Sequence, residues 1–123
     1  MANPNINTPS FCFANNALVS LSSTSETQIV SNSSSSGAVY LFDSIVAANT
    51  SASSVDITIT MYAATTNTGT AYRVANTITV PAKSTLVVVS KNVGLNLKES
   101  QSLYATASAS ASLVVTAFWK EFS

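Results

Sequence analysis

The sequence contains no histidine and a single cysteine, and these scarcities exclude most kinds of enzyme active site. Histidine is the commonest general base and the usual ligand of zinc, copper and non-haem iron, so Ser-His-Asp and Cys-His catalysis are excluded. A lone Cys12 forms neither an internal disulfide nor a Cys-x-x-Cys site. Because it stands between Phe11 and Phe13, we interpret it as a small apolar residue near the start of a strand.

Charge is also scarce. Five Lys and Arg balance five Asp and Glu, the formal net charge is +0, and charged residues make up 8% of the 123 residues. Without a basic cluster, we expect binding to neither nucleic acid nor an anionic membrane. The chain instead contains 22 Ser, 15 Thr and 11 Asn. Such a surface is hydrated but nearly uncharged, so copies repel one another little and an assembly role is favoured.

The five carboxylates are scattered and form no acidic cluster of the kind that a calcium loop needs. Asp43 lies inside the apolar run 39–48, and we expect a strand-face residue paired with a lysine or a hydroxyl. An enzyme would need a carboxylate pair built from Asp43 or Asp56, with no supporting motif. The three glycines are isolated and form no phosphate-binding loop. We therefore expect a non-enzymatic protein with no catalytic, cofactor-binding or metal-binding residues and no cofactor.

The length of the chain predicts one folded domain. A chain of 123 residues buries roughly two-thirds of the surface that its unfolded form exposes, enough for a core without disulfides or metal. The first residues have neither a basic start nor an apolar stretch, so we expect no signal peptide. No apolar run approaches the roughly 20 residues of a membrane-spanning helix.

The hydrophobic pattern has a period of two. Residues 55–62 read VDITITMY, which is typical of a strand with one face on a core. Similar patterns predict strands at 72–80 and 85–90, and the apolar runs 39–48 and 113–119 predict strands buried on both faces. Shorter candidates are 17–21, 27–30, 94–97 and 102–106, and polar loops are expected at 32–37, 49–54 and 65–70. We predict a single all-β antiparallel β-sandwich, jelly-roll-like, with about eight short strands and little or no helix.

Two further segments have an unusual composition. Residues 105–112 alternate alanine with threonine or serine, which indicates either a hairpin between two strands or a flat small-residue surface for a neighbouring subunit. Residues 1–10 contain Pro4, Pro9 and three asparagines without any alternation. We divide the chain into an extended N-terminal arm, residues 1–16, and a β-sandwich domain, residues 17–123.

The C-terminal half has a recognisable order of strands and turns. A strand ends in Val80-Pro81-Ala82, residues 95–105 run from Leu-x-Leu through a polar loop into a strand, and residues 113–118 form a final strand. With 39–46 and 55–62 as the preceding hairpin, residues 39–122 resemble small β-sandwich virion proteins of tailed bacteriophages. Those proteins often have Gly-Asp in the polar loop, where this chain has Glu-Ser-Gln at 99–101. The resemblance implies a many-copy component of a particle surface, on head or tail, and no catalytic residues.

On this basis we predict a capsid decoration or cement protein located in the virion. Its expected partners are other copies of itself and other virion proteins, the major capsid protein first. The arm, residues 3–13, is expected to add a strand to the exposed edge of a neighbour. A second expected contact is the C-terminal segment 119–122, although ordinary core packing is the alternative for Trp119 and Phe122.

Two alternatives stay open at this point. The same sandwich would serve as a neck, tail or fibre-attachment component, with neck or tail proteins as partners. A carbohydrate-binding β-sandwich would instead present exposed aromatic rings to sugars, and the candidates are Tyr62, Tyr72 and Tyr104.

Overall fold

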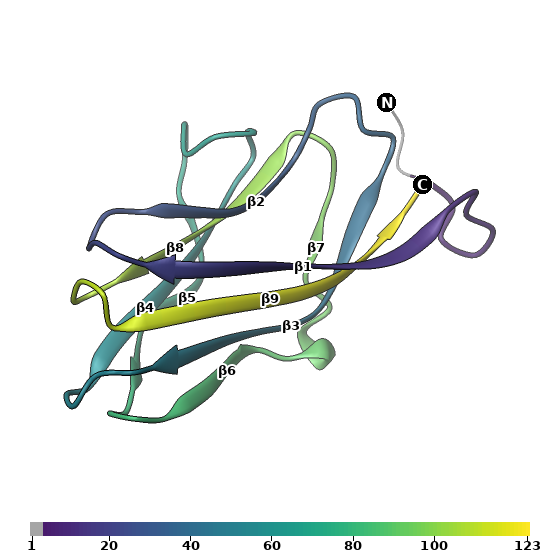
Figure 1. The fold of residues 1–123 in the computed structure, drawn as a ribbon. Helices are drawn as coiled ribbons and strands as arrows, with labels where there is room; N and C mark the ends of the chain where they lie inside the picture. The colour runs from purple at the N-terminus through teal and green to yellow at the C-terminus, as the bar shows by residue number, and fades with distance from the viewer. Residues whose placement is uncertain (1–3) are drawn as a thin grey trace.

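The computed structural model describes residues 4–123, and these form nine strands and one short 3-10 helix (Figure 1). The helix is η1 (Lys91–Val93), which ends at Gly94 in the left-handed conformation, φ 72°. The strands are β1 (Cys12–Leu21), β2 (Thr27–Asn32), β3 (Val39–Asn49), β4 (Val55–Tyr62), β5 (Tyr72–Val80), β6 (Thr85–Val89), β7 (Asn96–Leu97), β8 (Gln101–Ala107) and β9 (Leu113–Phe122).

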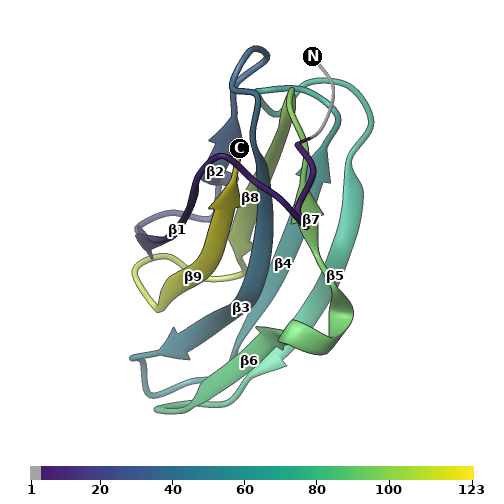
Figure 2. The same cartoon turned by 90° about the vertical axis from the view of Figure 1, so that its right-hand side faces the viewer.

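The strands build two antiparallel sheets that pack face to face (Figures 1 and 2). Sheet A has the order β1-β9-β3-β6, with β7 paired to β3, and sheet B has the order β2-β8-β4-β5. The pairs β1 with β9, β2 with β8, β3 with β6 and β4 with β5 are nested, as if one long hairpin had been folded across both sheets. This is jelly-roll connectivity, so the predicted antiparallel sandwich is confirmed.

The core lies between the two sheets and follows the alternation seen in the sequence. Val55, Ile57 and Ile59 of β4 are buried and meet Val115 and Ala117 of β9 in one apolar cluster. Because successive side chains of a strand point to opposite faces, these residues define the inner face of each sheet. The outer faces then consist of the intervening residues.

Several predicted boundaries differ from the structure. The first strand begins at Cys12 rather than at residue 17, so the expected limit of the arm at residue 16 falls inside β1. The candidate 94–97 contains only the two-residue strand β7. Segment 108–112 connects β8 of sheet B to β9 of sheet A, so the predicted hairpin is wrong. A period of two cannot show whether neighbouring strands share a sheet.

The predicted burial of the central strands β3 and β9 is also wrong. Both were predicted to be buried on both faces, because apolar residues occupy both sets of alternate positions. The structure buries Ala47 of β3 and Val115 of β9 on the inner face, whereas Val46 and Phe118 point away from the core and are only partly covered. The outer face of sheet A therefore has a composition typical of a covered surface.

Candidate assembly surface

Three adjoining rows of residues on the outer face of sheet A contain no charged side chain. Strand register places Leu18, Thr116, Val46 and Val87 side by side in one row across β1, β9, β3 and β6. The two flanking rows contain Ser20, Val114, Ala48 and Thr85 on one side, and Asn16, Phe118 and Ser44 on the other. We call these eleven residues the outer A face.

Three large apolar side chains of the outer A face are open to solvent. Leu18 is 74% exposed, Val87 56% and Phe118 42%. Single exposed apolar residues are normal on a protein surface, but three on one sheet face, with no charge between them, are typical of a surface that binds another molecule.

One ion pair and one hollow lie beside this surface. Lys120 of β9 donates to both oxygens of Asp43 at 3.2 Å, which confirms the expected lysine partner of Asp43. The two side chains line a hollow of about 260 Å³ together with Leu41, Lys91 and Phe122. The charged side chains of sheet A thus lie next to the outer A face and not within it.

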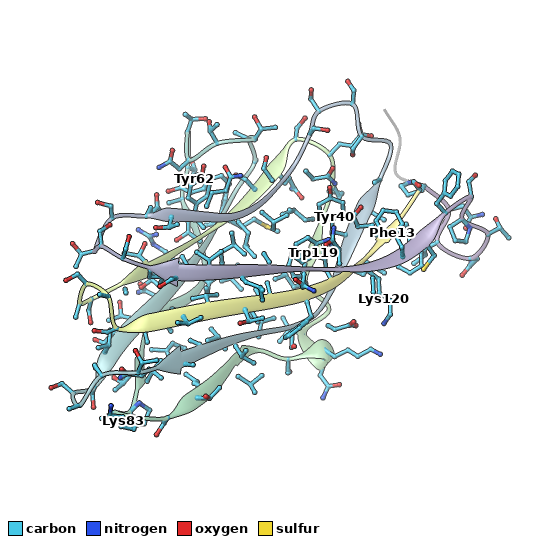
Figure 3. All side chains as sticks on the ribbon, viewed as in Figure 1. Phe13, Tyr40, Tyr62, Lys83, Trp119 and Lys120 are labelled. Carbon is cyan, nitrogen blue, oxygen red and sulfur yellow. The ribbon has the colours of Figure 1, made fainter. Side chains whose placement is uncertain are left out.

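Trp119 faces the core rather than the outside. It is 4% exposed, its ring lies 5.8 Å from that of Tyr40 and 5.4 Å from that of Phe42, and its Nε1 donates to Glu121. Figure 3 shows Trp119 and Tyr40 together, with Lys120 on the other side of sheet A. Burial, and secondarily the charge of Glu121, raises the pKa of Tyr40 above its ordinary 10.0. Core packing is therefore the role of Trp119, while Phe122 is half-buried.

Around Tyr62 and Tyr104 the outer face of sheet B is covered by the chain itself, and we call this part the closed face. Tyr62 and Tyr104 point outward from β4 and β8, yet they are only 5% and 7% exposed, and their rings meet edge to face at 5.5 Å. The Tyr62 hydroxyl donates to Glu26 at 2.7 Å, and that of Tyr104 donates to Gln28 at 3.0 Å. Burial, and then the hydrogen bond to Glu26, raises the pKa of Tyr62 above 10.0.

Loop 63–70 completes this cover. Ser102 of β8 donates its hydroxyl to the carbonyl of Ala64 at 2.7 Å, and Ser31 of β2 donates to the carbonyl of Thr65 at 2.9 Å. Of the three tyrosines considered for carbohydrate stacking, only Tyr72 is therefore open to solvent, at 57%. Nothing in the amino-acid sequence indicated that this loop would lie over sheet B.

Ahead of β1, the described residues 4–11 of the N-terminal arm make few hydrogen bonds with the rest of the chain. Residues 5–8 form a turn in which the amide of Thr8 donates to the carbonyl of Asn5 at 3.2 Å. Phe11 and Ser123 exchange two backbone hydrogen bonds of 2.9 Å, which extends the pairing of β1 with β9 by one residue. Ile6 and Phe11 are exposed. Asn3, the first residue of the predicted contact segment, lies outside the described residues.

The chemical groups considered for catalysis are not brought together. Asp43 lies on the outer side of sheet A, and Asp56 on that of sheet B, where it accepts a hydrogen bond from Thr79 at 2.8 Å. Within residues 4–123 no three His, Cys, Asp or Glu side chains form a group that could hold a metal ion. No helix in the same part of the chain has the length and hydrophobicity needed to span a membrane.

Comparisons with known proteins identify relatives by fold only. The chain matches no protein-family model and no curated protein. It is similar to a chain of the Bacillus endospore appendages, a family of disulfide-linked pili, with a TM-score of 0.55 and 16% identity over 91% of this chain and 88% of that one. It is equally similar to a chain of the acid-stable capsid of Helicobacter pylori bacteriophage KHP30, with a TM-score of 0.55 and 8% identity over 94% and 90% of the two chains.

A chain of the cyanophage Pam1 capsid aligns with a TM-score of 0.41 and 9% identity over 99% of this chain and 91% of that one, which is too low for the two folds to be equated. The β-sandwich is thus one that also occurs in a phage capsid and in a bacterial pilus.

Proposed function

We propose that the protein is a non-enzymatic virion structural protein of a tailed bacteriophage, a capsid decoration or cement protein that contacts the major capsid protein and stabilises the head lattice. The outer A face carries this proposal, because it is an uncharged surface on which Leu18, Val87 and Phe118 are open to solvent. The fold shared with a chain of a phage capsid supports it.

The outer A face suits a non-polar contact. Leu18, Val87 and Phe118 are large apolar side chains already held on rigid strands, so burying them costs little conformational entropy. Apolar area removed from water contributes about 25 cal/mol per Å², and no charge on this face has to be desolvated. The occupant is therefore a capsid surface that is itself weakly charged and apolar.

The arm supplies a second contact. Residues 4–10 are joined to the sandwich mainly through the Phe11–Ser123 pair, so removing residues 1–10 leaves every strand intact. We expect the truncated chain to fold with an unchanged far-UV circular dichroism spectrum but to be lost from particles. Normal incorporation of the truncated chain would contradict the role of the arm.

The position of the protein on the particle is tested by labelling. A small tag after Ser123 is detected by electron microscopy on purified particles, with thermal unfolding of the tagged chain as the control for folding. Label in lattice positions over the head supports decoration. Label confined to neck or tail replaces it with the ring or fibre component, and unlabelled particles overturn a virion role.

A pair of matched variants tests the surface. Val87→Glu places a carboxylate in the middle row of the outer A face, and Tyr72→Glu places the same charge at a similarly exposed position of sheet B. Because a buried unpaired charge costs several kcal/mol, we expect Val87→Glu to weaken binding to particles by at least about tenfold. Tyr72→Glu should bind like the unmodified chain. Equal binding of both variants would exclude the outer A face as the contact.

A further inference from the structure

Besides the two-residue β7, the two sheets have four edge strands, and three of them are protected against pairing with another chain. An exposed edge is a template for a further strand, and proteins block it with charges, bulges, short strands or covering loops. The three protected edges are β2, β5 and β6.

Each protected edge uses at least one of these devices. β6 has only five residues, and its pairing with β3 shifts register at Ile45. β5 carries Arg73, shifts register twice against β4, and holds Thr77 at a left-handed φ of 53°. β2 shifts register after Gln28 and lies against loop 63–70.

Strand β1 uses none of them. It has ten residues, CFANNALVSL, with no charge and no proline, and it pairs with β9 without any shift of register. Phe11 and Ser123 exchange both backbone bonds, so in an antiparallel ladder Phe13, Asn15, Ala17 and Val19 also turn their backbone groups toward β9. The N–H and C=O groups of Cys12, Ala14, Asn16, Leu18 and Ser20 therefore point to the open edge.

Those edge groups lack partners almost completely. Among the described residues, only the Asn16 amide is bonded, to Oδ1 of its neighbour Asn15 at 2.8 Å. Side chains along the strand are also open, since Phe13 is 51% exposed although it points to the inner side of sheet A. An uncharged, regular and unpaired edge of this length fits a second strand of the same kind.

We infer that β1 pairs antiparallel with β1 of a second copy of this chain, about a two-fold axis at Asn16. Asn16 is the middle of the five residues with free backbone groups, so only this centre pairs all five. Cys12 then lies opposite Ser20 of the second copy, and Ala14 lies opposite Leu18. The bond between Asn16 and Asn15 is exchanged for one across the interface.

The register also brings apolar side chains together. Phe13 lies opposite Val19 of the second copy on the inner side, a cross-strand pair of an aromatic and a β-branched residue. Because the paired positions share a face, the two-fold axis is perpendicular to the sheet. Both outer A faces then point the same way, and the two A sheets become continuous. This pairing goes beyond the proposed function and does not depend on it.

The inference is tested in solution on the full chain. Sedimentation equilibrium up to about 0.1 mM should show a dimer for the unmodified protein. Asn16→Lys and Asn16→Glu each place two like charges opposite one another at the axis, and each should be a monomer, whereas their equimolar mixture should recover the dimer. Asn76→Lys, the same change on β5, is the control and should remain dimeric.

A covalent variant tests the register with native Cys12 as the reporter. Ser20→Cys should form a disulfide-linked dimer on mild oxidation, since directly opposed residues of a hydrogen-bonded pair have Cα atoms about 5.5 Å apart. Ala14→Cys, which faces Leu18 of the second copy instead, should stay uncrosslinked. A monomeric unmodified chain, or a dimer unaffected by Asn16→Lys, would overturn the inference whatever the result of the particle experiments.

Discussion

The outer faces of the two sheets differ in what covers them. On sheet B, Thr60 and Ser102 point away from the core and are still fully buried, because loop 63–70 and the tyrosine network lie over them. On sheet A, the corresponding outward positions include Leu18 and Val87, which are mostly exposed. A chain with 22 Ser and 15 Thr had polar residues to place there. The comparison shows that sheet A leaves large apolar side chains open to solvent at outward positions, whereas sheet B covers even polar ones.

The largest difference between the faces should appear in stability. Tyr62→Ala removes a buried ring and leaves Glu26 without its hydroxyl donor, so we expect the free energy of unfolding to fall by about 3 kcal/mol or more. Phe118→Ala removes a ring from the open face and should cost about 1 kcal/mol or less. Urea unfolding of both variants measures the difference.

A control separates the ring from its hydroxyl. Tyr62→Phe keeps the packing against Tyr104 and loses only the bond to Glu26, so its loss should lie between those of the two alanine variants. If Phe118→Ala were as destabilising as Tyr62→Ala, the outer A face would be part of the folded core rather than a surface kept for a partner.

A smaller effect is expected in alkaline solution. The pKa of Tyr62 is raised in the folded chain, so above pH 10 the unfolded chain loses this proton before the folded chain does. The stabilisation is complete below pH 10.0 and is lost as pH rises through the raised pKa of the folded state. Unfolding free energy measured between pH 8 and pH 11 should therefore fall at the upper end.

Two variants assign this fall to the closed face. Tyr62→Phe should flatten the decline, whereas Tyr72→Phe, which changes an exposed ring, should leave it unchanged. The pKa of Tyr40 is also raised, so Tyr40 accounts for the part of the fall in unfolding free energy that remains in Tyr62→Phe, and Tyr40→Phe measures this part. An identical decline in the chain with Tyr62→Phe would show that the hydroxyl of Tyr62 is not protected by the fold.

The alternation of apolar residues was sufficient to predict the strands and the sandwich. The pattern of 55–62 identified β4 with the same limits as the structure, because Val55, Ile57 and Ile59 meet a single core. Cys12 was correctly placed near the start of a strand, but the predicted strand 17–21 left out residues 12–16, because Cys12, Phe13 and Ala14 are all exposed and show no alternation of burial. Their strand conformation comes from pairing with β9, which lies about a hundred residues away in sequence.

The closed face could not be predicted for a similar reason. The apolar neighbours of Tyr62 in the sequence fit either a buried ring or an exposed ring that stacks on sugars. The hydrogen bond to Glu26, which holds the ring in its buried position, comes from a loop distant in sequence. The apolar runs of β3 and β9 did carry a usable signal: they indicated coverage on both faces. In the folded chain only the inner face of these two strands is buried, because their outer face lies on the open side of sheet A.

The smallest expected effect concerns the ion pair beside the outer A face. Lys120 and Asp43 are 3.2 Å apart, but their side chains are 43% and 36% exposed, so water and salt screen their attraction. The double-mutant cycle of Asp43→Asn and Lys120→Gln should give a coupling of about 0.2–1 kcal/mol in low salt, and less at high ionic strength. A coupling above about 2 kcal/mol would mean that the Lys120–Asp43 pair is shielded from water and salt, as the Tyr62–Glu26 contact is. The contrast between an open and a closed face would then not hold for this ion pair.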